Sequence, residues 1–266
     1  MSLLFAPILD TSPALQARLH LFGVLPAFAD LLKHSPQARA TLGGERFRLR
    51  IQSERNISAD LLFSESRCRF LRSSSSRAGV CLRFISHRQL NSQFSGNGFS
   101  FPMPTRGGTN IRALQVFKQL SLQLQEALSE PDPADNGQCA LHLRLTFGVA
   151  LAAACELIKY EGFSARLFAH DPNWSVQFSI GDTDFRAWLG KQNGQAQWGR
   201  GMAKAPLAHL HFKDPKIAKK ALGGKLDNVG AVTGGAITVC GLTPLVDRLS
   251  LIFERIPIYL PPPKAK

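Results

Sequence analysis

Two histidines separated by one residue are the first candidates for metal chemistry. His209 and His211 would lie on one face of a strand, as two ligands of a metal site require. The nearby sequence adds only one carboxylate, Asp214, and no cysteine or further histidine at a matching spacing. An exposed strand face therefore explains the pair better than a metal site, and we predict neither a metal nor a cofactor.

The remaining reactive residues do not form a catalytic pattern. Asp182 and Asp184 would make a paired-carboxylate site, but Gly181 beside them favours a hairpin turn. The glycines match neither a dinucleotide fingerprint nor a phosphate-binding loop, and no serine stands in a nucleophile elbow. None of the five cysteines belongs to a Cys-x-x-Cys pair, so buried free thiols are the simplest interpretation. Because no nucleophile and base can be paired, we expect a non-catalytic protein.

The charge of the chain favours anionic partners. Its 266 residues include 32 Lys and Arg against 19 Asp and Glu, a formal net charge of +13. Such a balance attracts nucleic acid, acidic lipid headgroups or phosphorylated metabolites without choosing among them. No apolar stretch approaches the length of a membrane helix, and the first residues lack the features of a secretory signal. We therefore expect a cytoplasmic protein that does not span a membrane.

One basic segment has the alternation of a half-buried strand. Residues 45–51 would place Arg46, Arg48 and Arg50 on one face and apolar side chains on the other. Arg67 and Arg69 would extend this basic surface, since guanidinium groups pair with phosphate oxygens. We predict that these five arginines contact an anionic surface; a solvated sheet face is the alternative.

The two halves of the chain share an order of features. Phe22-Gly23-Val24 and Phe147-Gly148-Val149 lie in apolar segments, 19–32 and 143–158, that predict opening helices. Strand-like segments then follow in each half, at 46–51, 60–64 and 78–84, and at 163–168, 174–179 and 205–212. Each half closes with an amphipathic helix, one over 111–128 capped by Thr109 or Asn110, the other over 245–256 opened by Thr243 and Pro244.

This order predicts an α+β fold of two domains, each an antiparallel sheet with helices packed on one face. The turn-rich segment 131–138 is the clearest linker, which places the N-terminal domain at 1–130 and the C-terminal domain at 139–266. The shared order suggests a divergent tandem pair.

The second half resembles the sterol carrier protein type two family of lipid-binding domains. The residues that carry the resemblance are a strand leading into a helix (207–214), a helix ending in Gly223-Gly224-Lys225, a Gly-flanked strand (234–241) and the helix 242–256. The first half shares Leu82 to Phe84, Phe94, Gly96 and its closing helix, but Pro102-Met103-Pro104 stands where the family has a Gly-flanked strand.

The resemblance implies a cavity between sheet and helices that holds a lipid, fatty acyl chain, sterol or isoprenoid quinone, without catalysis. Large apolar side chains would line it in the second domain: Phe178, Phe185, Trp188, Trp198, Met202, Leu210, Phe212, Leu245, Leu249 and Phe253. The implied role is that of a bacterial carrier or accessory protein, with an anionic membrane or a partner enzyme as further contacts. Two alternatives stay open: nucleic-acid binding by the basic N-terminal half, and a structural assembly module without free ligand.

Overall fold

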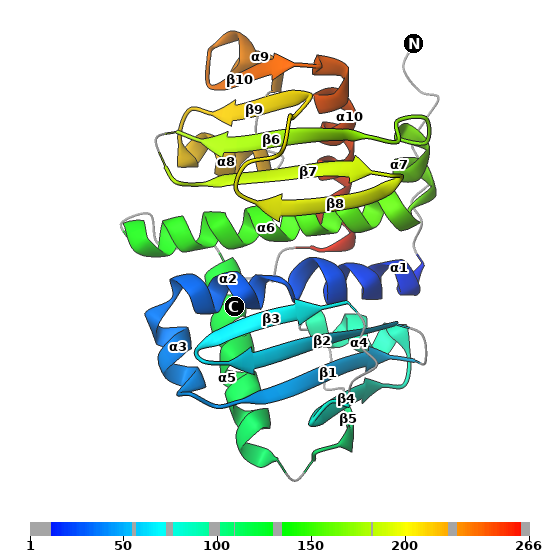
Figure 1. The fold of residues 1–266 in the computed structure, drawn as a ribbon, viewed down its shortest axis with the longest axis vertical. Coiled ribbons are helices and arrows are strands. Elements are labelled where there is room, and N and C mark those ends of the chain that lie inside the picture. The colour runs from blue at the N-terminus through cyan, green and yellow to red at the C-terminus, as the bar shows by residue number, and fades with distance from the viewer. Residues whose placement is uncertain are drawn as a thin grey trace. The chain divides into compact units, whose positions relative to one another are not determined.

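A computed structural model describes residues 12–54, 57–72, 77–95, 102–108, 110–129, 135–181, 183–222 and 228–261 (Figure 1). Several predicted features fall outside these residues, namely Thr109 as a cap, Gly96, Asp182, segment 131–134 and Gly223-Gly224-Lys225. The described residues form two compact units. An N-terminal unit holds residues 16–152 and 260–261, and a C-terminal unit holds residues 12–15 and 153–259. Since this division falls within a helix, the linker at 131–138 stays a prediction.

The described residues of the first half form five strands, helices of seven to eighteen residues and shorter helical segments. In order these are α1 (Pro13–Arg18), the π-helical segment η1 (Leu19–Val24), α2 (Ala27–His34), α3 (Pro36–Leu42), β1 (Phe47–Ser53), β2 (Ile57–Ser64), β3 (Arg67–Leu71), β4 (Val80–Phe84), α4 (His87–Phe94), β5 (Met103–Arg106) and α5 (Ile111–Leu128). The predicted cap of α5 is confirmed, because Asn110 Oδ1 accepts a 3.2 Å hydrogen bond from the Ala113 N–H.

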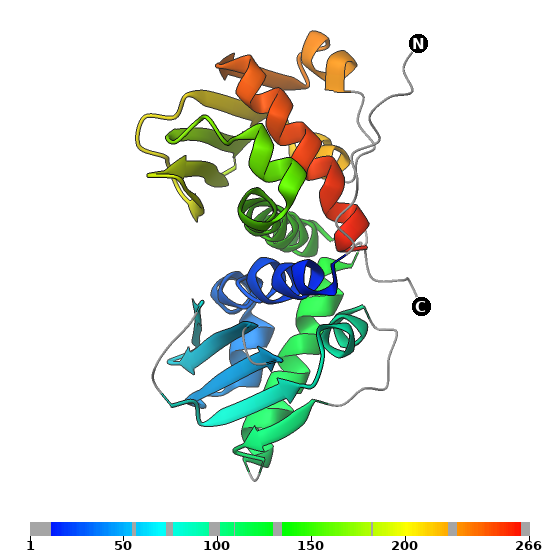
Figure 2. The same cartoon turned by 90° about the vertical axis from the view of Figure 1, so that its right-hand side faces the viewer.

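The N-terminal sheet has the order β3-β2-β1-β4-β5. Its pairs are antiparallel except that β1 runs parallel to β4, with Ile51 opposite Leu82. The alternation predicted for β1 is confirmed, because Phe47, Leu49 and Ile51 are all buried on one face. Helices α4 and α5 lie on one side of this sheet (Figure 2).

The second half forms α6 (Asn136–Tyr160), α7 (Gly162–Leu167), β6 (Trp174–Ile180), β7 (Arg186–Gln192), β8 (Gln195–Arg200), β9 (Ala208–Phe212), α8 (Pro215–Leu222), α9 (Asn228–Thr233), β10 (Ile237–Gly241) and α10 (Thr243–Tyr259). Its sheet has the order β10-β9-β6-β7-β8, with β6 parallel to β9 and Phe178 opposite Leu210. Both units therefore combine a sheet with helices, which confirms the α+β class. Neither sheet is wholly antiparallel as predicted, because in each the fourth strand along the chain pairs in parallel with the central strand.

The two sheets have the same connectivity. In each, the first strand lies at the centre, the second and third follow on one side as an antiparallel meander, and the fourth and fifth lie on the other side. Leu82 and Leu210 consequently occupy equivalent positions, each on the strand that runs parallel to the central one. A common origin of the halves stays a prediction.

Two local predictions are wrong. Segment 163–168 is not a strand but contains α7, where the Ala165 N–H donates to the Glu161 carbonyl at 2.8 Å. The buried residues there, Ser164 and Phe168, are four positions apart, which is a helical and not a strand spacing. In the first half, a strand does form from Met103 to Arg106, and it includes Pro104, because β5 is an edge strand, where proline is tolerated.

Among the described residues, one helical span, Gly137–Tyr160 within α6, is long and apolar enough to cross a membrane by length and composition alone. Core helices pass the same test, and 72% of the apolar window is buried inside the protein. The expectation that no apolar stretch approaches this length is therefore wrong, although the burial of α6 is that of a core helix.

Candidate functional site

The inner face of the C-terminal sheet gathers most of the predicted ligand-binding residues. Strand alternation and register place Phe178 of β6 beside Leu210 of β9, with Phe212 one step further along that strand. Helix α10 runs along this face (Figure 2), and its Phe253 meets the Phe178 ring edge-on at a centroid distance of 6.0 Å. Leu245 and Leu249 lie on the same stripe of α10, at spacings of four residues. Sheet and helix therefore enclose an apolar interior.

Part of this interior retains solvent exposure. Phe178, Phe212, Leu245 and Leu249 are buried. Four neighbouring apolar side chains are only half-buried: Trp198, Leu210, Val239 and Phe253. Leu210 is the most informative of them, because it lies on an inner strand of the sheet, where its counterpart Leu82 in the other unit is buried. The apolar face is thus less completely covered than a filled core.

Three predicted residues do not join this group directly. Trp188 is paired with Gln177 and Gly199, which places it on the opposite face of the sheet from Phe178. Met202 lies in the connection from β8 to β9 and is 67% exposed. Phe185 is buried immediately before β7, with the Arg200 guanidinium 5.5 Å from its ring centroid. The sequence missed the position of Trp188 because it did not fix which residues of β7 pair with β6.

The outer face of the same sheet is polar. Gln177, fully buried, donates to the carbonyls of Ala187 at 2.9 Å and Gly201 at 3.1 Å and accepts from the Ala203 N–H at 2.7 Å. These bonds hold the connection from β8 to β9, which crosses the sheet in Figure 1. Gln177 therefore has a structural role. Its position in the sequence, on a strand between two apolar residues, did not indicate this role.

Ser179 lies between the two histidines singled out from the sequence. Its Oγ is 2.7 Å from His209 Nε2 and 2.8 Å from His211 Nδ1. Burial lowers the pKa of His209, and the nearby His211 and Arg186 lower it further. Ser179 is itself only 1% exposed, and in the described chain no carboxylate is bonded to either imidazole. The described residues also contain no cluster of three metal-ligating side chains. A Ser–His pair without access or an orienting acid does not make an activated nucleophile.

A buried ionic group fastens the end of α10 to the start of α7. The Arg255 guanidinium donates to the Glu161 carboxylate, with Nε 2.8 Å from Oε1, and the Tyr259 hydroxyl donates to the same oxygen at 2.5 Å. The Ser164 hydroxyl donates to Glu161 as well. Burial alone would raise the pKa of Glu161, but these hydrogen bonds outweigh it and hold the pKa below its ordinary value. The network sets the position of α10 over the apolar face.

The predicted basic face exists in the N-terminal unit. Arg48 and Arg50 extend from one face of β1 and share a single carboxylate, Asp60 of β2, which is 1% exposed. Arg67 and Arg69 lie on the same face of the sheet, on β3, and are exposed. Arg46 pairs with Glu65 at 3.5 Å in solvent. Contact of these arginines with an anionic surface stays a prediction.

Replacing Asp60 with alanine should lower the free energy of unfolding by about 2 kcal/mol or more, because two partly buried guanidinium groups would lose their shared partner. Urea denaturation checks this. The matched control is Glu65→Ala, which removes an exposed partner and should cost less than about 1 kcal/mol. Equal effects of the two variants would contradict the structural role of Asp60.

No protein-family model matches the sequence, and no curated protein matches it. Partial matches to solved structures exist. A UbiJ-SCP2 ubiquinone synthesis protein is 10% identical, with 41% of this chain and 88% of that chain covered and a TM-score of 0.33. Sterol carrier protein domain 2 of Helicoverpa armigera is 12% identical, with 48% and 93% covered and a TM-score of 0.33.

A third match is of a different kind. The sec-alkylsulfatase Pisa1 from Pseudomonas sp. is 13% identical, with 53% of this chain and 28% of that protein covered and a TM-score of 0.27. Each of the three matches covers about half of this chain or less.

Proposed function

We propose that the C-terminal unit binds a hydrophobic ligand, a lipid or a fatty acyl, sterol or isoprenoid chain, as a non-catalytic carrier or accessory protein. The observation that supports this most is the incomplete burial of Leu210 on an inner strand, together with that of Val239, which is paired with it, and of Phe253, which contacts the neighbouring Phe178. An apolar ligand that removed these surfaces from water would gain free energy in proportion to the area buried. The resemblance of this half to sterol carrier protein domains agrees with the proposal.

The N-terminal unit is the weaker candidate for this role. Phe63 on its inner face is fully buried, stacks on Phe47 at 4.7 Å between ring centroids and meets Phe28 of α2 at 6.2 Å. Phe28 in turn meets Phe117 of α5 at 5.6 Å. Aromatic rings thus occupy the space between the sheet and its helices, where a ligand would otherwise lie.

Filling the apolar face should weaken ligand binding. Leu210→Trp adds an indole where the ligand would lie, and we expect it to weaken binding of a fluorescent fatty acid about tenfold or more. The control is Leu207→Trp, which adds the same group at a position that is 48% exposed and outside β9. Titration of the probe, with native mass spectrometry of the freshly purified protein, gives both affinity and stoichiometry.

The proposal fails if the wild-type protein carries no apolar molecule and binds neither fatty acid, sterol nor ubiquinone saturably. It also fails if Leu207→Trp weakens binding as much as Leu210→Trp. An assembly role, in which the apolar face is covered by another protein, would then become the better explanation.

A further inference from the structure

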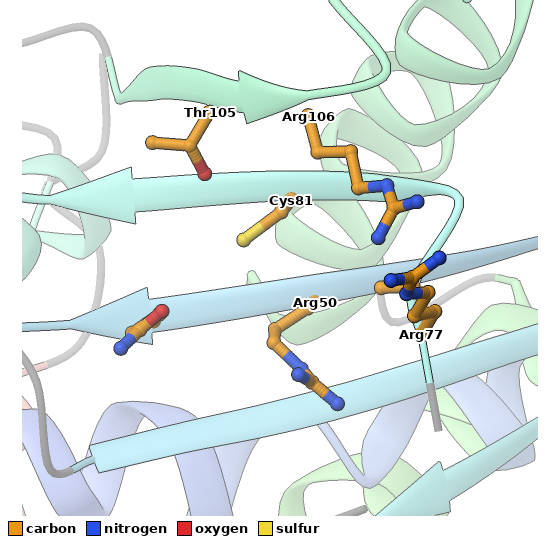
Figure 3. Close-up of a pocket in the computed structure, with 7 residues that line it drawn as sticks. Arg50, Arg77, Cys81, Thr105 and Arg106 are labelled. Carbon is orange, nitrogen blue, oxygen red and sulfur yellow. The ribbon is translucent and has the colours of Figure 1, made fainter. Parts of the chain in front are cut away.

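The outer face of the N-terminal sheet contains a pocket that the hydrophobic-ligand proposal does not use. It is open to solvent and has a volume of about 310 Å³, and its wall includes the polar or charged side chains of Arg50, Gln52, Arg77, Cys81, Thr105 and Arg106 (Figure 3). This volume lies at the lower end of the range for small-molecule sites. The wall contains three guanidinium groups and no carboxylate.

Three separate parts of the fold bring these arginines together. Arg50 of β1 is paired with Cys81 of β4, and Cys81 is paired with Arg106 of β5, so the three residues lie side by side across the sheet on one face. Arg77 enters from the segment that leads into β4. The pocket is thus a product of the strand order, and the arginine spacing in the sequence does not reveal it.

The backbone segments that carry Arg77 and Arg106 approach each other closely. Gly107, next to Arg106, has a φ of +69°, and a Cβ atom there would lie 2.1 Å from the carbonyl oxygen of Gly79. Only glycine fits such an approach without strain. The segments that carry Arg77 and Arg106 are therefore held against each other.

The positive charge of the pocket is only partly balanced. Arg50 is paired with Asp60, but that carboxylate also serves Arg48. Within the part of the chain that the structure describes, no acidic side chain pairs with Arg77 or Arg106. Like charges held around one concave space repel each other, and an anion between them would remove that cost.

We propose that this pocket binds the phosphate group of a phosphomonoester. Such a group carries a charge of about −1.5 to −2 at neutral pH, which matches the two guanidinium groups that have no described partner, whereas a phosphodiester carries a single charge. Its three terminal oxygens suit bidentate donation from Arg77 and Arg106, with the Thr105 hydroxyl as a further donor. The proposal concerns the N-terminal unit and does not depend on ligand binding by the C-terminal unit.

The test is calorimetric titration of the full chain with glycerol 3-phosphate, and with dimethyl phosphate as the diester comparison, at constant ionic strength. We expect saturable binding of one glycerol 3-phosphate and at least about tenfold weaker binding of dimethyl phosphate. The double variant Arg77→Gln/Arg106→Gln should weaken glycerol 3-phosphate binding by about tenfold or more. The control Arg88→Gln/Lys118→Gln removes two exposed cations, one on α4 and one on α5, that lie outside the pocket, and should leave the affinity within about twofold.

Flotation with vesicles containing phosphatidic acid or an equal charge of phosphatidylglycerol separates the two sources of the phosphomonoester. Pocket-dependent preference for phosphatidic acid would assign a lipid headgroup, and glycerol 3-phosphate binding without that preference would assign a soluble ligand; both support the site. The proposal is overturned if glycerol 3-phosphate does not bind saturably, if dimethyl phosphate binds as well, or if the control variant loses as much affinity. Circular dichroism of both double variants confirms that each is folded before the titration.

Discussion

Replacing Arg255 with methionine should lower the free energy of unfolding by about 3–5 kcal/mol. The variant keeps the apolar length of the side chain but leaves the Glu161 carboxylate, 1% exposed, without its cation in a buried site. Urea denaturation measures the change. The matched control is Arg46→Met, whose partner Glu65 is 72% exposed and whose loss should cost less than about 1 kcal/mol.

The pH dependence of this effect identifies its cause. Because the folded pKa of Glu161 lies below its ordinary value of 4.5, the network contributes stability above that value, and the contribution is lost as the pH falls through the folded pKa. In Arg255→Met the buried Glu161 carboxyl group is protonated more readily, because its charged form no longer has a cation beside it. The gap between wild type and variant should therefore narrow in acid. Adding Glu161→Gln to Arg255→Met should recover part of the lost free energy of unfolding. If the gap does not narrow in acid and the double variant recovers nothing, Arg255 acts through packing alone.

Acidification from pH 7 to pH 4 should remove about 3 kcal/mol of stability through a second buried group, His20. Its side chain lies in η1, is 4% exposed, and is 5.0 Å from the Phe94 ring between centroids. Burial lowers its pKa from 6.5 to about 4, and no described residue forms a hydrogen bond with its Nε2. The His20 imidazole is therefore protonated below about pH 6.5 in the unfolded chain but only below about pH 4 in the folded protein.

The variant His20→Leu isolates this contribution. Between pH 6.5 and pH 4, the free energy of unfolding of this variant should fall by about 3 kcal/mol less than that of the wild type. Each unit of difference between the folded and unfolded pKa of His20 corresponds to about 1.4 kcal/mol. Urea denaturation at a series of pH values measures it. His170→Leu, which removes an exposed imidazole, is the control and should retain the wild-type dependence. Parallel curves for wild type and His20→Leu would contradict the assignment.

Local patterns in the sequence were sufficient for much of the fold. The alternation in 46–51 predicted which side chains of β1 are buried, because neighbouring residues of a strand must face opposite sides. Asn110 predicted the start of α5, because its side chain satisfies a free N–H of the first turn. Segment 163–168 failed, because its alternation is weak and contacts with Glu161 favour a helix.

The residues of the apolar face were predicted in composition, but their geometry was not. Six of its proposed residues, on β6, β9 and α10, do gather around one face: Phe178, Leu210, Phe212, Leu245, Leu249 and Phe253. Trp188 does not, since its face depends on its register against β6, and register is a property of paired strands.

By itself, the sequence determined the α+β class, the bounds of some elements such as α5 and β6, the excess of positive charge and the supply of large apolar side chains, since these depend on neighbours along the chain. Tertiary structure alone decided which charges meet. Asp60 became the partner of both Arg48 and Arg50 only when β2 paired with β1, and Glu161 met Arg255 across 94 residues. Arg50, Arg77 and Arg106 line one pocket because β4 inserts between β1 and β5, an order that no local pattern encodes.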